Sequence, residues 1–400
     1  MMNKRCIGFL AGFLLLLPPS AMAVAGEGIQ LGPALLFPAL SATSTYNDNI
    51  RLASVNPETS WVTSISPSIR VALPVRRFYL NAEAGLDFLS FSKIDEDNKT
   101  DWSVGAAGGA DFPGGLSFKI ADKHALRFLI GSQEYGAGED LTVNNLTATV
   151  AYAIRSVLRL ELSGIRTAST YDRSVQRDRV ETTVQADLYW KFRPAISGIF
   201  ETSYVVYGYD SNTAQDGSAT QIALGLTWDV TAKSTGFAKA GFQWKRYDDQ
   251  SQALGTENGS YYTLSAGMRH CFTPRTVLTL DLTRASQESS FKENPYYLMT
   301  TFDASLTQRL TSKLYARAGV RYGRDEYPNA TSYDNPFDTS TGLESGKRTD
   351  TTLGASVSLG FDVTRWLSLE LAYGGERRNS SFDTFDYDVN RVTLGARAAF

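Results

Sequence analysis

The C-terminal end of the chain alternates between apolar and polar positions. Between residues 391 and 400 the even positions are apolar, and the odd positions include Arg391 and Arg397. A period of two is typical of a β-strand with one apolar face and one water-exposed face. The same alternation recurs in segments 184–192, 262–272, 353–363 and 367–374, where helical spacing does not fit. The pattern predicts an all-β protein.

The connections between the predicted strands alternate between short and long. Short turns of Pro, Gly, Ser, Thr and Arg lie at 73–75, 112–115, 155–156, 193–194, 231–234, 273–275, 311–312 and 364–365. Longer polar stretches lie at 48–60, 93–99, 126–143, 171–178, 210–217, 248–260, 288–297, 325–348 and 380–386. These connections separate about 18 strands, with 16 as the alternative because segments 61–72 and 115–125 alternate weakly.

An even number of strands with short turns at one end and long loops at the other is typical of bacterial outer-membrane barrels. A soluble sandwich explains any single strand, but sandwiches do not alternate short and long connections along the whole chain. Aromatic residues near the strand ends, such as Trp190, Trp244 and Trp366, suit the girdles of a lipid-facing band. We therefore predict a transmembrane antiparallel up-and-down β-barrel in the bacterial cell outer membrane, with short periplasmic turns and long outer loops.

The first residues have the pattern of a secretory signal peptide. Lys4 and Arg5 precede an apolar run over 7–17, and small residues at Ala21 and Ala23 form a cleavage pattern. The run is too short to span a bilayer as a helix. The expected division is a signal peptide at 1–23, a short N-terminal periplasmic segment at 24–39 and the barrel at 40–400.

Composition excludes several classes of function. The net charge of −3 is not that of a typical nucleic-acid binder, and two Cys with two His nearly exclude a Cys/His metal cluster or a disulfide framework. A hydrolytic enzyme would need His124 or His270 as a base, and neither a Gly-x-Ser-x-Gly nor a His-Glu-x-x-His motif is present. We expect no enzyme activity, no cofactor, no metal and no nucleic-acid partner.

Strand parity selects the charged residues expected to line the lumen of the barrel. They are Asp187, Lys191, Glu201, Arg269, Asp281, Arg317, Arg321, Asp362, Glu370, Arg391 and Arg397. These charges either face water in a wide interior or select a solute, since barrels of this size leave an aqueous channel unless something fills it. The loops near 126–143 and 325–348 are the candidates to fold inward and narrow it.

Tyrosines crowd three regions. They lie at Tyr204, Tyr207 and Tyr209, at Tyr261 and Tyr262, and at Tyr296 and Tyr297. They either form the interfacial girdle or, as the alternative, an aromatic track on which sugar rings stack.

One segment near the N-terminus carries a family resemblance. The opening strand at 37–50, which ends in Tyr46-Asn47-Asp48-Asn49-Ile50, resembles a family of outer-membrane β-barrel porins found in exopolysaccharide biosynthesis operons. The turn at 111–116 is similar as well. The resemblance implies outer-membrane lipid, polysaccharide and periplasmic export components as partners. The terminal Phe400 resembles the signal that the barrel-assembly machinery reads.

Three functions follow as hypotheses. The first is a channel or accessory for exopolysaccharide export, which the resemblance implies. The second is a general or nutrient-uptake diffusion porin, and the third is a closed structural barrel at the cell surface. An open lumen favours the first two, and a lumen filled by the protein's own loops favours the third.

Overall fold

The computed structural model describes residues 28–94, 97–130, 138–211, 215–231, 233–248, 258–291, 294–334 and 343–400. The expected signal peptide and its cleavage site lie outside these residues. In the described part of the chain no helix is long and apolar enough to cross a membrane.

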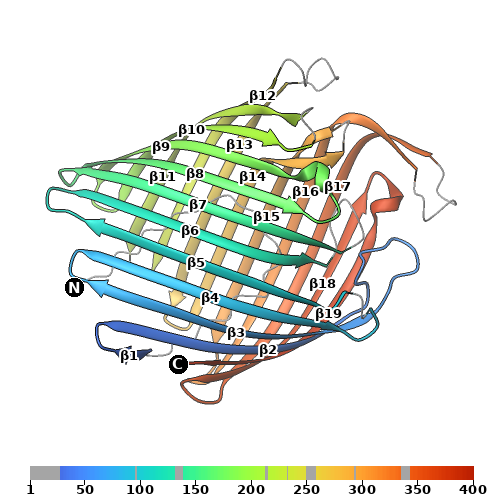
Figure 1. The fold of residues 1–400 in the computed structure, drawn as a ribbon, viewed down its shortest axis with the longest axis horizontal. Coiled ribbons are helices and arrows are strands. Elements are labelled where there is room, and N and C mark those ends of the chain that lie inside the picture. Colours follow the sequence, from blue (N-terminus) through green and yellow to red (C-terminus); the bar gives the residue numbers. More distant parts are fainter. Residues whose placement is uncertain are drawn as a thin grey trace.

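The described residues form nineteen β-strands and two short 3-10 helices (Figure 1). The strands are β1 (Ile29–Leu31), β2 (Ala34–Asn47), β3 (Ser60–Val75), β4 (Phe78–Phe91), β5 (Lys99–Asp111), β6 (Leu116–Leu129), β7 (Glu139–Ile154), β8 (Leu158–Tyr171), β9 (Arg179–Arg193), β10 (Ile196–Tyr209), β11 (Gly217–Thr231), β12 (Ser234–Tyr247), β13 (Gly259–Thr273), β14 (Thr276–Phe291), β15 (Asn294–Arg309), β16 (Leu314–Asp334), β17 (Leu343–Asp362), β18 (Leu367–Ser380) and β19 (Tyr387–Ala399). The helices are η2 (Val175–Arg177) and η4 (Asp383–Phe385).

Each strand from β2 onward pairs antiparallel with the next, and β19 closes the sheet on β2. The closing register runs from Arg391 opposite Asn47 to Ala399 opposite Ala39. Strands β2 to β19 of the described chain therefore form a closed 18-stranded up-and-down barrel, as predicted, and the alternative of 16 strands is wrong. The short strand β1 is an addition that pairs with β2 through Ile29 and Leu36. The first barrel strand begins at Ala34, earlier than the expected start at residue 40.

The short turns all lie at one end of the barrel, which we call the turn end, within three residues of their predicted positions. The opposite end is the loop end. Three loops there are shorter than predicted, because the strands continue into the stretches 126–143, 288–297 and 325–348. Polar sequence hid these strands, since beyond a lipid-facing band nothing requires alternate residues to be apolar.

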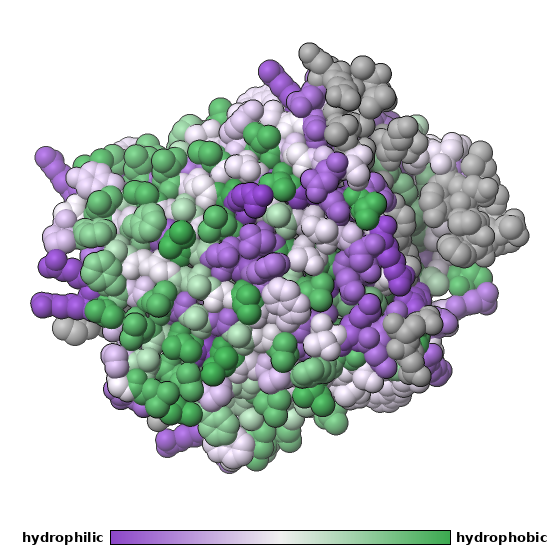
Figure 2. Space-filling model, viewed as in Figure 1, coloured by the Kyte–Doolittle hydropathy of each residue, from purple (hydrophilic) through white to green (hydrophobic). Residues whose placement is uncertain are grey.

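The outer face of the wall is apolar and the inner face is polar. Leu224, Leu353 and Leu394 are each more than 60% exposed, and the large exposed apolar side chains of each strand share one parity. Figure 2 shows hydrophobic residues over most of the outer face on the side toward the turn end. An apolar surface of this extent is far larger than a soluble monomer exposes, so the outer face is suited to lipid.

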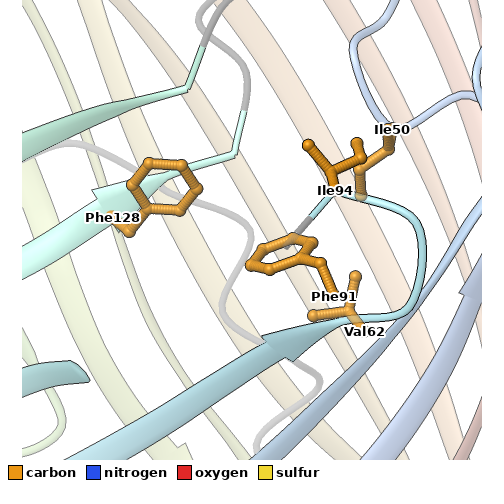
Figure 3. Close-up of a cluster of buried hydrophobic side chains, with 5 residues drawn as sticks. All are labelled: Ile50, Val62, Phe91, Ile94 and Phe128. Atoms are coloured by element: carbon orange, nitrogen blue, oxygen red, sulfur yellow. The ribbon is translucent and has the colours of Figure 1, made fainter. Parts of the chain in front are cut away.

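A small hydrophobic core lies at the loop end of the first strands of the barrel (Figure 3). Val62 of β3, Phe91 of β4 and Phe128 of β6 pack with Ile50 and Ile94 from the connecting loops. The Phe91 and Phe128 rings meet edge to face, with centroids 6.0 Å apart. Such aromatic contacts add to the burial of apolar area, and they hold two loops against the ends of their strands.

Candidate functional site: a hairpin folded across the lumen

The hairpin of β14 and β15 leaves the barrel wall at the loop end. Pairing of β13 with β14 stops where Leu264 lies opposite Arg284, and pairing of β15 with β16 stops where Leu298 lies opposite Glu326. Beyond those points the two strands pair only with each other, up to Phe291 opposite Asn294. Residues 285–291 thus have no pairing with β13, and residues 294–297 have none with β16, so both can take another direction.

The tip of this hairpin contacts residues on β10, on β12 and just before β11. The hydroxyl of Tyr209 on β10 donates to Glu288 Oε2 at 2.6 Å, although three strands separate β10 from β14. The ammonium group of Lys245 on β12 pairs with Glu288 Oε1. Gln215, just before β11, donates from Nε2 to the carbonyl of Ser289 at 3.4 Å. Contacts that skip strands in this way run through the interior, so the hairpin folds into the lumen.

We call the surroundings of the Lys245–Glu288 pair the tyrosine anchor. Both charged side chains are buried, and Lys245 Nζ lies 4.5 Å from the ring centroid of Tyr207 and 5.4 Å from those of Tyr247 and Tyr296. A desolvated ammonium over aromatic faces gains from the ring quadrupoles. The charge of Glu288 is compensated by Lys245, and the surrounding rings fill the space around the pair. This side of the hairpin is therefore a packed contact and not a ligand cavity.

The other side of the hairpin tip rests on an arginine anchor. The Arg348 guanidinium on β17 lies 3.4 Å from the ring centroid of Phe385, 4.6 Å from that of Tyr327 and 5.4 Å from that of Phe291. Asp350 accepts from Arg348 Nε at 3.0 Å and from Nη2 at 2.7 Å, and it also pairs with Arg378.

Asn294 and Asn329 add a reciprocal pair of hydrogen bonds of 2.7 and 3.0 Å between the hairpin and β16. The tip is therefore held from β10 around to the loop that joins β18 and β19.

Below the hydrophobic core at its loop end, the opposite wall carries exposed charged side chains. Strand β5 lies nine strands from β14 in the ring of 18, and its neighbours carry Glu83 and Lys123 on the inner face. These two side chains form a 2.8 Å ion pair but remain 49% and 46% exposed. Inward positions around them are small, namely Gly85, Gly105, Ala107 and Ala121. The wall of β4 to β6 thus presents exposed charged side chains across the barrel from the hairpin.

The register places all eleven predicted lumen residues on the inner face, opposite in parity to the exposed apolar side chains. Several are already paired. Glu201 lies opposite Asp187 and accepts from Lys239 at 2.6 Å. Arg321 pairs with Asp303 at 3.2 Å, and Asp362 with Arg309 at 3.3 Å. Contact of these groups with a solute stays a prediction.

Lys191 and Arg269 lie near the turn end. Lys191 is exposed, and Arg269 donates to Cys271 Sγ at 3.2 Å.

The sequence did not predict that the β14–β15 hairpin folds inward. The expected inward loops were 126–143 and 325–348, of which 131–137 and 335–342 lie outside the described residues. The inward-folded residues are 285–291 and 294–297. Across 285–297 alternation fades and the sequence carries five acidic or aromatic residues, namely Glu288, Phe291, Glu293, Tyr296 and Tyr297. That loss of alternation was the available signal, but it reads equally well as an ordinary loop.

The tyrosines of the three regions divide between the outer face and the interior. Tyr204 and Tyr262 are about half exposed and share the outward parity, where a girdle is expected. Tyr207, Tyr209, Tyr261 and Tyr296 are instead buried in or beside the tyrosine anchor. The rings that were candidates for stacking on sugars thus hold the hairpin.

The two histidines are both packed against aromatic rings. His124 contacts Trp102 with centroids 5.0 Å apart, and His270 contacts Phe272 at 4.6 Å. Among the described residues no group of three His, Cys, Asp or Glu side chains is arranged to hold a metal ion.

A closed 18-stranded barrel with an apolar outer face and an inward-folded hairpin defines an outer-membrane porin. The chain belongs to the family described as "Putative beta-barrel porin 2", whose model matches residues 23–400. The protein is accordingly located in the bacterial outer membrane, and the loop end is the extracellular end. A search of curated protein sequences found no match.

Solved porin structures share the fold. The outer membrane protein OpdK from Pseudomonas aeruginosa is 13% identical with a TM-score of 0.50, covering 91% of this chain and 99% of its own. OccK2 (OpdF) from the same organism is 12% identical with a TM-score of 0.51, covering 91% and 98%. OccAB3 from Acinetobacter baumannii is 9% identical with a TM-score of 0.50, covering 92% and 100%. At these identities the likeness concerns the fold alone.

Proposed function

We propose that the protein is a diffusion channel for small hydrophilic solutes, in which the β14–β15 hairpin narrows an aqueous path against the wall of β4 to β6. The observation that carries the proposal is the hairpin itself, held from both sides while Glu83 and Lys123 on the opposite wall stay exposed. A wide barrel needs such a device to discriminate among solutes, because 16–18 strands otherwise enclose an open pore.

The remaining wall supports a path for polar solutes of either charge. Glu83 and Lys123 present one charge of each sign at the same height, and the small neighbours Gly105 and Ala107 leave the space in front of them free. A polar solute can form and break hydrogen bonds with these side chains as it passes, as expected for a porin.

Export of exopolysaccharide is the second candidate, and it rests on the family resemblance of residues 37–50. It predicts a sugar-binding surface in the lumen. Four of the tyrosines that would supply one are buried in or beside the tyrosine anchor, so we rank solute diffusion first. Polysaccharide and periplasmic export components as partners belong to this second candidate, and the closed structural barrel is the third.

The test is single-channel conductance in a planar bilayer, for the natural chain and for a variant in which residues 286–297 are replaced by an Asn-Gly turn. The natural channel should conduct steadily, and the variant should conduct several times more and admit larger polyethylene glycols. Both must first show the shifted gel mobility of an unheated, folded barrel. Equal conductance of the two proteins would show that the hairpin is not the constriction. If neither protein conducts, the structural barrel is favoured. Block by oligosaccharides, absent with glycerol, would favour polysaccharide.

A further inference from the structure

The outer face of β6, β7 and β8 carries a polar patch where lipid is expected. Leu116, Phe118 and Ile120 on β6 are exposed with outward parity, and the next two outward residues on that strand are Asp122 and His124. The register adds Asn144 on β7, opposite His124, and Arg166 on β8. Figure 2 shows hydrophilic side chains amid hydrophobic ones in the middle of this face, which the strands β6 to β8 form in Figure 1.

The patch lies within the part of the strands that crosses the membrane. A transmembrane β-strand needs roughly 9–11 residues to cross the hydrocarbon. Asp122 is the seventh residue of β6, counted from the turn end, and Arg166 the ninth of β8. A charge on the lipid face costs most at the midplane and little near the interfaces, so the cost is larger for Asp122 than for Arg166, which lies toward the outer edge of the band. A polar partner would lower it.

Among the outward arginines of the described chain, Arg166 combines the lack of a partner with a position away from the end of its strand. Arg284 pairs with Glu326 at 3.1 Å, and Arg377 lies 3.6 Å from Asp388. Arg246 is exposed but is the penultimate residue of its strand, at the edge of the band. Arg166 is exposed in mid-strand, and within the described part of the chain it makes no hydrogen bond or ion pair.

Asp122 is only partly satisfied, by Asn144 Nδ2 at 3.0 Å. The patch thus holds one acid with spare acceptor capacity and one base with free donors.

The arrangement of these two charges is self-complementary. In the register Asp122 lies opposite Leu146, and Leu146 lies opposite Arg166, so the apolar residue sits midway between the acid and the base. Asp122 and Arg166 make no ion pair with each other in the described chain, and the Leu146 side chain lies between them. A twofold axis beside Leu146, parallel to the barrel axis, would bring Asp122 of each copy to the same side as Arg166 of the other, and the long arginine side chain can span the difference in height that the strand tilt leaves between them.

We propose that this face binds a second copy of the chain in the same membrane, with Asp122 of each copy against Arg166 of the other and the two Leu146 side chains in contact at the axis. Isologous contacts of this kind are the commonest way in which homodimers form. A phosphate-bearing lipid headgroup fits less well, because the patch has no net charge and Asp122 would repel the anion.

The experiment combines a charge-swap cycle with cross-linking, using the full-length refolded protein. The mass of the natural chain in lipid nanodiscs should be that of a dimer by native mass spectrometry. Asp122→Arg and Arg166→Asp alone should each weaken dimerisation at least tenfold, since like charges then face each other. The double variant should restore it. Arg246→Asp, on a distant strand, is the matched control and should leave the dimer intact.

Cross-linking tests the position of the axis. In a Cys271→Ser background, Leu146→Cys should form a disulfide-linked dimer on mild oxidation, whereas Leu226→Cys on the outer face of β11 should not. Shifted gel mobility of each unheated variant shows that the barrel has folded.

A monomeric or trimeric natural chain, or equal cross-linking at both positions, would overturn the proposal. So would loss of co-purified lipid phosphate in Arg166→Asp with an unchanged mass, which would assign Arg166 to a lipid headgroup. None of these outcomes bears on conductance, so the dimer and the proposed channel can fail separately.

Discussion

Two lysine–glutamate ion pairs on the inner wall differ in burial, and burial decides how much each contributes to stability. Lys245 and Glu288 are buried among tyrosines, whereas Lys123 and Glu83 are about half exposed. A buried pair costs desolvation, and removing one partner leaves an uncompensated charge. An exposed pair is screened by water and contributes little. The first pair therefore holds the hairpin, and the second lines the path.

We expect Lys245→Met to lower the free energy of unfolding by about 3–5 kcal/mol, because Glu288 is left buried and unpaired. The double variant Lys245→Met, Glu288→Gln should recover much of that loss. The matched change Lys123→Met should cost only about 0–1 kcal/mol. Urea unfolding in lipid vesicles, followed by tryptophan fluorescence, measures all three. Equal losses for Lys245→Met and Lys123→Met would contradict the tyrosine anchor.

At the scale of elements, β14 and β15 each have two parts with different neighbours. Below Arg284 and Leu298 they are ordinary wall strands that pair on both sides. Above these residues they pair only with each other, and half of their backbone groups have no partner strand. An isolated two-stranded hairpin is marginal in water, so the part above depends on the two anchors at its tip.

Hydrogen exchange should separate these two parts. Amides in residues 285–291 are expected to exchange faster than those in 276–284, because the ladder to β13 has ended. Segment 240–245 of β12 is paired on both sides at the same end of the barrel and is the control. Mass spectrometry of peptides in nanodiscs measures the rates. Uniform protection along β14 would mean that the hairpin is bound more firmly than its register indicates.

For the whole molecule, closure depends on the seam between β19 and β2. At the turn end Phe400 donates its backbone N–H to the Pro38 carbonyl at 3.1 Å, and its ring stacks on Trp366 at 5.5 Å. At the loop end Asn49 Nδ2 donates to the carbonyl of Asp388 at 3.0 Å, and Asp48 accepts from the Asn390 N–H at 2.6 Å. The segment 46–50 that carries the family resemblance thus joins the first and last strands.

Deletion of Phe400 is expected to reduce barrel assembly, since it removes the ring and the last backbone bond of the seam together. Phe400→Trp should keep the stacking and assemble normally. Phe112→Ala, an exposed aromatic at the same end, is the control. The folded fraction, read from the gel mobility of unheated samples and from outer-membrane levels, measures the effect. Normal assembly without Phe400 would show that the assembly machinery reads another feature.

Much of the wall was predictable from sequence, for a local reason. Each residue of a barrel strand faces either lipid or water, so the period of two appears in any short window. The alternation at 391–400, the eight short turns, the strand number and the inward parity of Arg391 and Arg397 followed from it. Closure also followed, because a sheet with open edges is not tolerated in lipid.

Only the tertiary structure decided where the lumen is narrowed. At the loop end the lipid no longer imposes alternation, so the polar run at 288–297 has the pattern of a loop although residues 288–291 and 294–297 are strand. The partners of Glu288 come from β10 and β12, and those of Phe291 from β16, β17 and the loop before β19. No local pattern encodes such pairings, because residues distant in the chain meet only after the barrel has closed.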